Sequence, residues 1–242
     1  MLEAQNTLIS SDLLLGFADS ELALSPTHRC LLHPLVVEPL DALTFAAEKA
    51  GFVLKVASSY RNFERQLLIW NSKATGIRPV LDTNGIPLDI TQLSDKEKIF
   101  AILHWSALPG ASRHHWGTDV DVYDASRISP DYSLQLTVAE TEGDGPFTEF
   151  HQWLSAELKS TELNSTELNG NSHGFYRPYQ HDIGGIAPEP WHLSYAPVAT
   201  LYAAQFTEDL LRKQLQKTDI ALKETLLENL GEIYQRFIQP YC

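Results

Sequence analysis

Two stretches of the sequence bring together side chains of the kinds that bind metal ions. His114 and Asp121 lie in the first stretch, SRHHWGTDVDVYD, and Glu189 and His192 lie in the second, EPWHLSY. Two histidines and one carboxylate fill three positions of a tetrahedral zinc ion and leave the fourth open, which is typical of catalytic zinc sites. A further carboxylate beside such an ion can act as a general base. The sequence therefore predicts a catalytic zinc centre.

The first stretch also indicates how its carboxylates are presented. Aspartate and valine alternate from Asp119 to Val122, two residues after a glycine at which the chain can turn. This alternation predicts a β-strand. Successive side chains of a strand point to opposite faces, so we expect Val120 and Val122 to face the core and Asp119 and Asp121 to share the other face.

The helices and strands that must position these groups are indicated by the spacing of apolar residues along the sequence. Apolar residues recurring every three or four positions predict helices, and clusters of β-branched and aromatic residues predict strands. The expected helices cover residues 36–50, 63–70, 95–103 and 147–158, and the expected strands cover residues 52–57, 119–123, 173–177 and 193–195. We expect a long surface loop at residues 75–93 and a polar loop without chemistry at residues 160–172, where STELN is repeated.

Two helix starts are marked by capping residues. Asn62 is a suitable N-cap, which would place Arg61 at a strand-to-helix junction with its guanidinium free to enter a cleft and Gln66 one turn further on. Ser94 and Glu97 have the spacing of a capping box. Both signals predict where a helix begins.

Composition excludes several classes of partner. The formal net charge is −13 and the pI is about 5.0, whereas binding to nucleic acid or to an anionic membrane requires clustered basic residues. We expect neither partner. The acidic start of the printed sequence and its short apolar runs predict a cytoplasmic protein, or a periplasmic one if an export signal has been removed. Cys30 and Cys242 are expected to be free thiols.

The last part of the sequence is expected to be helical. Tyr202, Phe206 and Leu210 recur every fourth residue, and a second apolar stripe begins at Leu222. We interpret residues 1–198 as one domain and the remainder, 199–242, as a helical extension of two helices packed on it. The alternative is that these helices bind a partner or mediate oligomerisation.

Three motifs in order give the chain a resemblance to a known family. The sequences SSYRNFERQ, PGASRHHWGTDVD and GFYRPYQHDIGGIAPEPWHLSY resemble those of the VanY-type zinc carboxypeptidases of bacterial cell-wall peptides, the D-alanyl-D-alanine carboxypeptidase family. The similarity spans roughly residues 52 to 195. It implies an α+β fold in which a small antiparallel sheet carries a zinc site and is flanked by helices.

The resemblance also implies roles for individual residues. Zinc would be held by His114, Asp121 and His192, and Glu189 would be the catalytic base. Arg61 would bind or polarise the substrate near the scissile bond, with two further residues lining the cleft, namely Gln66 and Ser112. The substrate would be a peptidoglycan stem peptide or muropeptide.

Asp119 departs from the family pattern, in which a small residue is usual at this position. A second carboxylate on the metal face could tighten zinc, orient a ligand histidine or contact an amine of the substrate. A fourth metal ligand is a further alternative. The sequence leaves these roles open.

The substrate hypothesis follows from the expected location. A cytoplasmic member of the family would meet tetrapeptides returned from the wall, so we predict an L,D-carboxypeptidase that removes the terminal D-alanine during muropeptide recycling. One alternative is a D,D-carboxypeptidase or D,D-dipeptidase that acts on D-Ala-D-Ala ends. The other is a non-catalytic zinc-binding module, although such a module would have no need of Glu189.

Overall fold

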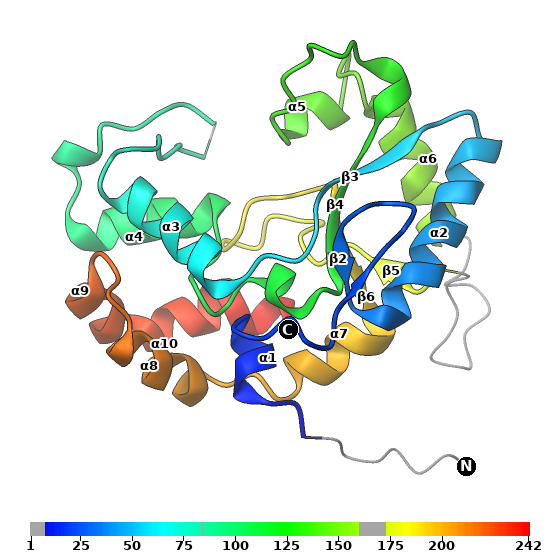
Figure 1. The fold of residues 1–242 in the computed structure, drawn as a ribbon. Helices are drawn as coiled ribbons and strands as arrows, with labels where there is room; N and C mark the ends of the chain where they lie inside the picture. The colour runs from blue at the N-terminus through cyan, green and yellow to red at the C-terminus, as the bar shows by residue number, and fades with distance from the viewer. Residues whose placement is uncertain (1–7, 84, 160–172) are drawn as a thin grey trace.

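A four-stranded antiparallel sheet lies at the centre of the fold (Figure 1). The computed structural model describes residues 8–83, 85–159 and 173–242 and gives the strand order β3-β4-β6-β5. The strands are β3 (Leu54–Ser58), β4 (Asp119–Asp124), β5 (Phe175–Tyr176) and β6 (His192–Tyr195). Each neighbouring pair is antiparallel. The predicted α+β class with a small antiparallel sheet is confirmed.

Helices flank this sheet on both sides. They are α1 (Ser11–Leu15), α2 (Pro34–Lys49), α3 (Phe63–Ala74), α4 (Asp95–Trp105), α5 (Val138–Thr141), α6 (Thr148–Lys159), α7 (Ala196–Ala203), α8 (Glu208–Lys217), α9 (Lys223–Glu228) and α10 (Leu230–Ile233). A separate two-stranded ribbon pairs β1 (Ala23–Leu24) with β2 (Leu31–Leu32). Among the described residues, none of the helices has the length and apolar character needed to cross a membrane.

One face of the sheet is packed against α2 and α6. Val120 and Val122 of β4 and Leu193 of β6 are fully buried there, in a cluster with Leu40 and Phe150. Burying each such side chain contributes about 1.5–3 kcal/mol of stability. The predicted alternation along β4 is therefore confirmed, and the opposite face of the same strands is left for polar groups.

The C-terminal helices form a second core with α3 and α4, on the other side of the sheet (Figure 1). Leu211 and Leu226 are buried with Trp70 and Leu103. The expectation of two helices from about Ala199 onward is wrong, because the structure divides this region among α7, α8, α9 and α10. The second apolar stripe does not start a helix cleanly, since Leu222 has a positive φ of 65° and turns the chain before α9.

Local sequence signals were reliable where a side chain caps its own helix. The Asn62 side chain accepts a hydrogen bond from the Arg65 amide at 2.9 Å, and Ser94 and Glu97 form the expected capping box. The loop at residues 75–93 contains one short 3₁₀ turn, Ile90–Gln92. The STELN repeat lies outside the described residues. The two cysteines are free, as predicted.

The turn before β4 generates a prediction about stability. Gly117 has a φ of +67°, and a Cβ atom there would lie 2.9 Å from the backbone nitrogen of His33. The change Gly117→Ala should therefore lower the free energy of unfolding by about 3 kcal/mol, measured by urea denaturation. Gly51→Ala is the matched control, since Gly51 has a φ of +89° but nothing within 4 Å, and should cost only about 1 kcal/mol. Equal losses would show that the close approach at Gly117 is unimportant.

Candidate metal centre

The predicted metal ligands converge on the polar face of the sheet. Asp121 and His192 are direct partners in the β4–β6 register, and His114 lies on the 3₁₀ turn that precedes β4. The His114 Nε2 atom is 3.3 Å from Asp121 Oδ2, and the His192 Nδ1 atom is 3.1 Å from Asp121 Oδ1. One donor atom from each of the three buried residues lies within 4.8 Å of the others. The structure thus brings together the three residues that the sequence singled out.

The chemistry of this group fits a zinc ion. Among the described residues, the buried His114 Nδ1 has no hydrogen-bond partner, and leaving such an atom unsatisfied costs about 1–3 kcal/mol. The buried Asp121 Oδ1 lies 3.1 Å from the His192 Nδ1 atom. A cation held between the three side chains would satisfy the carboxylate oxygen. Two imidazoles and a carboxylate are donors that zinc accepts.

The charge state of Asp121 also suits a metal ligand. Burial alone would raise the pKa of this carboxyl, but the charges and hydrogen bonds of His114 and His192 outweigh burial and hold the pKa well below its usual range. Metal ligands of this kind bind in the deprotonated form. Asp121 is therefore ready to coordinate a cation.

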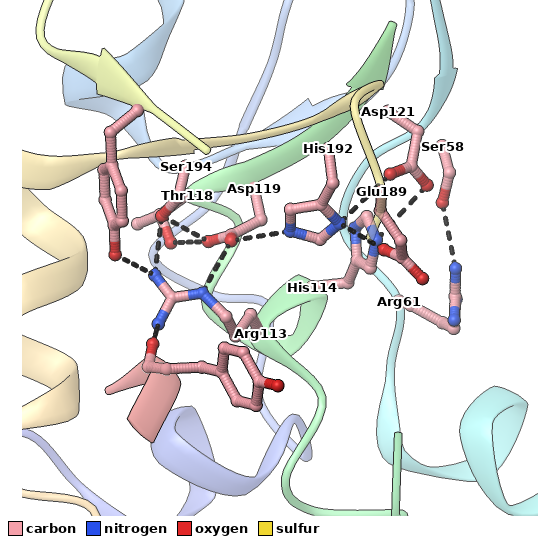
Figure 2. A network of polar contacts seen from close by, with 12 residues as sticks. Ser58, Arg61, Arg113, His114, Thr118, Asp119, Asp121, Glu189, His192 and Ser194 are labelled. Atoms are coloured by element: carbon pink, nitrogen blue, oxygen red, sulfur yellow. Dashed lines mark hydrogen bonds and ion pairs between the residues drawn. The ribbon is translucent and has the colours of Figure 1, made fainter. Parts of the chain in front are cut away.

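Asp119 fixes the orientation of His192 (Figure 2). The His192 Nε2 atom lies 2.9 Å from Asp119 Oδ1, which leaves Nδ1 of the same ring on the metal side. The same carboxylate accepts hydrogen bonds from Arg113 Nε at 2.9 Å, from Thr118 Oγ1 at 2.5 Å and from Ser194 Oγ at 3.1 Å. Histidines that bind metals commonly donate their other ring N–H to a carboxylate in this way. Of the roles left open for Asp119, the geometry supports orienting a ligand histidine.

Arg113 balances the buried charge of Asp119, and sequence reasoning missed it. Its guanidinium is 3% exposed and donates to the Tyr241 carbonyl at 2.6 Å, to Ser194 Oγ at 2.6 Å and to Tyr176 Oη at 3.0 Å. Burial lowers its pKa, but the charge of Asp119 outweighs burial and raises the pKa above the ordinary arginine value. The available signal was its position directly before His114 in the first motif.

Arg61 lies where the sequence predicted, between β3 and α3. Its Nη1 donates to Gln66 Oε1 at 2.8 Å and its Nη2 donates to Ser58 Oγ at 3.1 Å. Gln66 is 0% exposed and donates in turn to the Ala107 carbonyl at 2.7 Å. The expectation that Gln66 lines the cleft is therefore wrong, because the glutamine is buried behind the guanidinium. It positions Arg61.

His115 holds the backbone of Arg61. Its Nδ1 lies 2.5 Å from the Arg61 carbonyl oxygen, and its Nε2 accepts the Gly110 amide at 3.1 Å. Burial is the main cause that lowers the pKa of His115 to about 3, so the ring is neutral. These contacts account for the buried histidine without a catalytic role.

The ligand group opens into a cavity of about 410 Å³. Glu189 lies at its edge with Oε2 3.4 Å from His192 Nδ1. Tyr179, which the sequence did not single out, packs its ring edge against His192 at a centroid distance of 4.8 Å. The cavity is lined by all the predicted site residues except Gln66 and Asp119, namely Arg61, Ser112, His114, Asp121, Glu189 and His192.

Comparison with known proteins identifies the family. The VanY family, described as D-alanyl-D-alanine carboxypeptidase, matches residues 29–198, which is more than half of the chain. The protein therefore belongs to the VanY D-alanyl-D-alanine carboxypeptidase family, and its cofactor is zinc. Members of this family are peptidases that act on peptidoglycan peptides, as the sequence motifs led us to expect.

Individual relatives extend this result. Two uncharacterized proteins of Haemophilus influenzae are 46% identical over 103 residues (41% of this chain and 70% of that protein) and 31% identical over 133 residues (54% and 92%). A solved structure of VanYB in complex with D-Alanine-D-Alanine has a TM-score of 0.50 and 22% sequence identity, and the match covers 83% of this chain and 91% of that chain. This structural likeness concerns the fold.

The Asp119 geometry predicts a loss of zinc affinity in a conservative variant. Asp119→Asn should weaken zinc binding about 10- to 100-fold, because the amide is a poorer acceptor for the His192 ring. Competition against a chromophoric chelator measures this affinity. The control is Asp124→Asn, which changes another buried carboxylate of β4 that accepts the Val53 amide at 2.8 Å, away from the metal group. Equal zinc losses in both variants would refute the orienting role.

Proposed function

We propose that the protein is a zinc carboxypeptidase that removes the C-terminal D-amino acid from peptidoglycan stem peptides. The observation that carries the proposal is the presence of the Arg61 guanidinium in the same cavity as the ligand group and Glu189. Among the ion pairs of the described residues, none includes Arg61. A site that cuts only at chain ends needs a cation to hold the terminal carboxylate, and Arg61 is available for it.

In this proposal His114, Asp121 and His192 hold the ion. Bound zinc supplies Lewis-acid chemistry, since it acidifies water and polarises a carbonyl group. Asp119 keeps His192 in the ring orientation that directs Nδ1 toward the ion. All three ligands are buried side chains in the wall of the cavity.

Glu189 is proposed as the general base. It takes a proton from the attacking water and delivers it to the departing amine, which is ordinary acid–base work for a carboxylate in a cleft. Its side chain is 17% exposed, so it reaches both the cavity and the ligand His192. A purely structural zinc site would not need a carboxylate here, and this argues against the non-catalytic alternative.

Arg61 is proposed to bind the terminal carboxylate of the substrate. A planar guanidinium makes two parallel charge-assisted hydrogen bonds to a carboxylate. Ser58 and Gln66 already fix its orientation, so little side-chain entropy is lost on binding. Ser112, which is buried in the cavity wall, is a further substrate-binding candidate.

Our finer proposal concerns the bond that is cut. We propose L,D cleavage of tetrapeptides, the reaction needed in cytoplasmic recycling of wall peptides. The second candidate is D,D cleavage of D-Ala-D-Ala ends, which the description of the family favours. Both reactions use the same ligands, base and carboxylate clamp, and they differ in the configuration of the residue before the scissile bond.

Incubation with defined peptides distinguishes these reactions. We expect the enzyme to remove D-alanine from a tetrapeptide, and mass spectrometry of the products detects the loss. A tetrapeptide with an amidated C-terminus is the control and should resist cleavage, because Arg61 then has no carboxylate to bind. Loss of D-alanine from a pentapeptide alone would refute the L,D assignment and leave the D,D one.

The role of Glu189 is tested separately. Glu189→Gln should retain zinc and lower the rate of hydrolysis about 10²- to 10⁴-fold, which is the usual contribution of a general acid–base group. Metal analysis and a kcat measurement on the same preparation check both parts. Full activity in this variant would remove the proposed mechanism.

A further inference from the structure

One wall of the cavity carries positive charge that the proposed reaction does not use. Lys73 in the last turn of α3 and Arg78 in the following loop both line the cavity that contains the metal group. Among the ion pairs found in the described parts of the chain, none includes either residue. In a protein with a formal net charge of −13, two unpaired cations at this place require an explanation.

The protein surroundings of Lys73 are unfavourable for an ammonium group. Its Nζ donates to Ser106 Oγ at 2.7 Å, and the bond reaches across to the residue that ends α4. Burial, followed by the charge of Arg78, lowers the pKa of Lys73 to about 8. The charge of Glu189 acts in the opposite direction and raises this pKa, and the charge of Arg61 lowers it further. A half-buried cation held by one hydroxyl is the environment expected of a site that receives an anion.

An ordinary role in the helix does not account for this geometry. A lysine in the last turn of a helix can stabilise the helix dipole by interacting with the terminal carbonyl groups. Here the Lys73 ammonium donates its hydrogen bond to Ser106, the C-cap residue of α4, on the cavity side. The position of Arg78 beside it also adds repulsion that a capping role would not need.

We propose that Lys73 and Arg78 bind a second carboxylate of the substrate, separate from the terminal carboxylate assigned to Arg61. The enzyme then prefers stem peptides whose third residue carries a side-chain carboxylate, the diaminopimelate type, over the lysine type. Diaminopimelate and lysine differ only by that side-chain carboxylate. The inference rests on the proposed function, because it places a stem peptide in the cavity. The cavity of about 410 Å³ has room for more than a terminal alanine.

Two tetrapeptides that differ only in this third residue test the proposal. Their affinities are measured by calorimetry on the full chain loaded with zinc and carrying Glu189→Gln, with and without Lys73→Met. We expect Lys73→Met to weaken binding of the diaminopimelate peptide about 10-fold or more, the effect of losing one charge-assisted hydrogen bond. Binding of the lysine peptide should change less than about twofold.

The control variant is Lys217→Met, which removes an exposed lysine at the end of α8 and should change neither affinity. Thermal melting checks that each variant is folded. Should Lys73→Met fail to fold, Arg78→Gln changes an exposed residue and gives the same comparison. Equal losses of affinity for both peptides would overturn the proposal, because Lys73 would then bind the terminal carboxylate that both peptides share. Unchanged affinities for both peptides would also overturn it.

Hydrolysis by the unsubstituted enzyme separates this inference from the proposed function. Selective binding of the diaminopimelate peptide without cleavage would refute the carboxypeptidase proposal and keep the carboxylate site. Cleavage of both peptides without any difference in affinity would support the carboxypeptidase proposal and refute the second carboxylate site. Failure to bind either peptide would overturn both.

Discussion

The buried contact between Asp119 and His192 is the interaction on which the metal centre depends. A carboxylate that is 0% exposed is stable only when its charge is compensated, and Arg113 supplies that charge at 2.9 Å. The compensated carboxylate then fixes the ring of His192 by its Nε2 atom. Removing Arg113 would leave the buried charge of Asp119 unpaired, and removing Asp119 would leave the ring of His192 free to rotate. The orientation of the ligand residue His192 is thus set by residues outside the ligand group.

The sheet turns this local interaction into a site. Because β4 and β6 are antiparallel neighbours in a register that pairs Asp121 with His192, two ligands face each other without any loop having to close. The valines between the aspartates anchor β4 in the core under α2 and α6. A shift of one residue in this register would exchange the valine and aspartate faces. The register that packs the valines in the core is therefore the same register that places the metal ligands.

The sequence predicted what local rules determine. The strand at Asp119, the cap at Asn62 and the capping box at Ser94 depend on side chains close in sequence, and all three were correct. The convergence of the ligand residues was also anticipated, since their types and order are informative. The burial of Gln66 and the pairing of Arg113 were missed, because each depends on partners distant along the chain. The breaks between the C-terminal helices were missed for the same reason.

The contact between Arg113 and the carbonyl of Tyr241 affects when the site can form. Arg113 and Asp119 leave the ribosome almost together, but Ser194 and Tyr241, which complete the hydrogen bonds of the pair, are synthesised much later. A nascent chain that ends before residue 241 has already made every metal ligand but cannot yet shield the arginine from water. Burial of the Arg113–Asp119 pair, and with it the fixed orientation of the His192 ring, therefore requires that the C-terminal segment has packed into place.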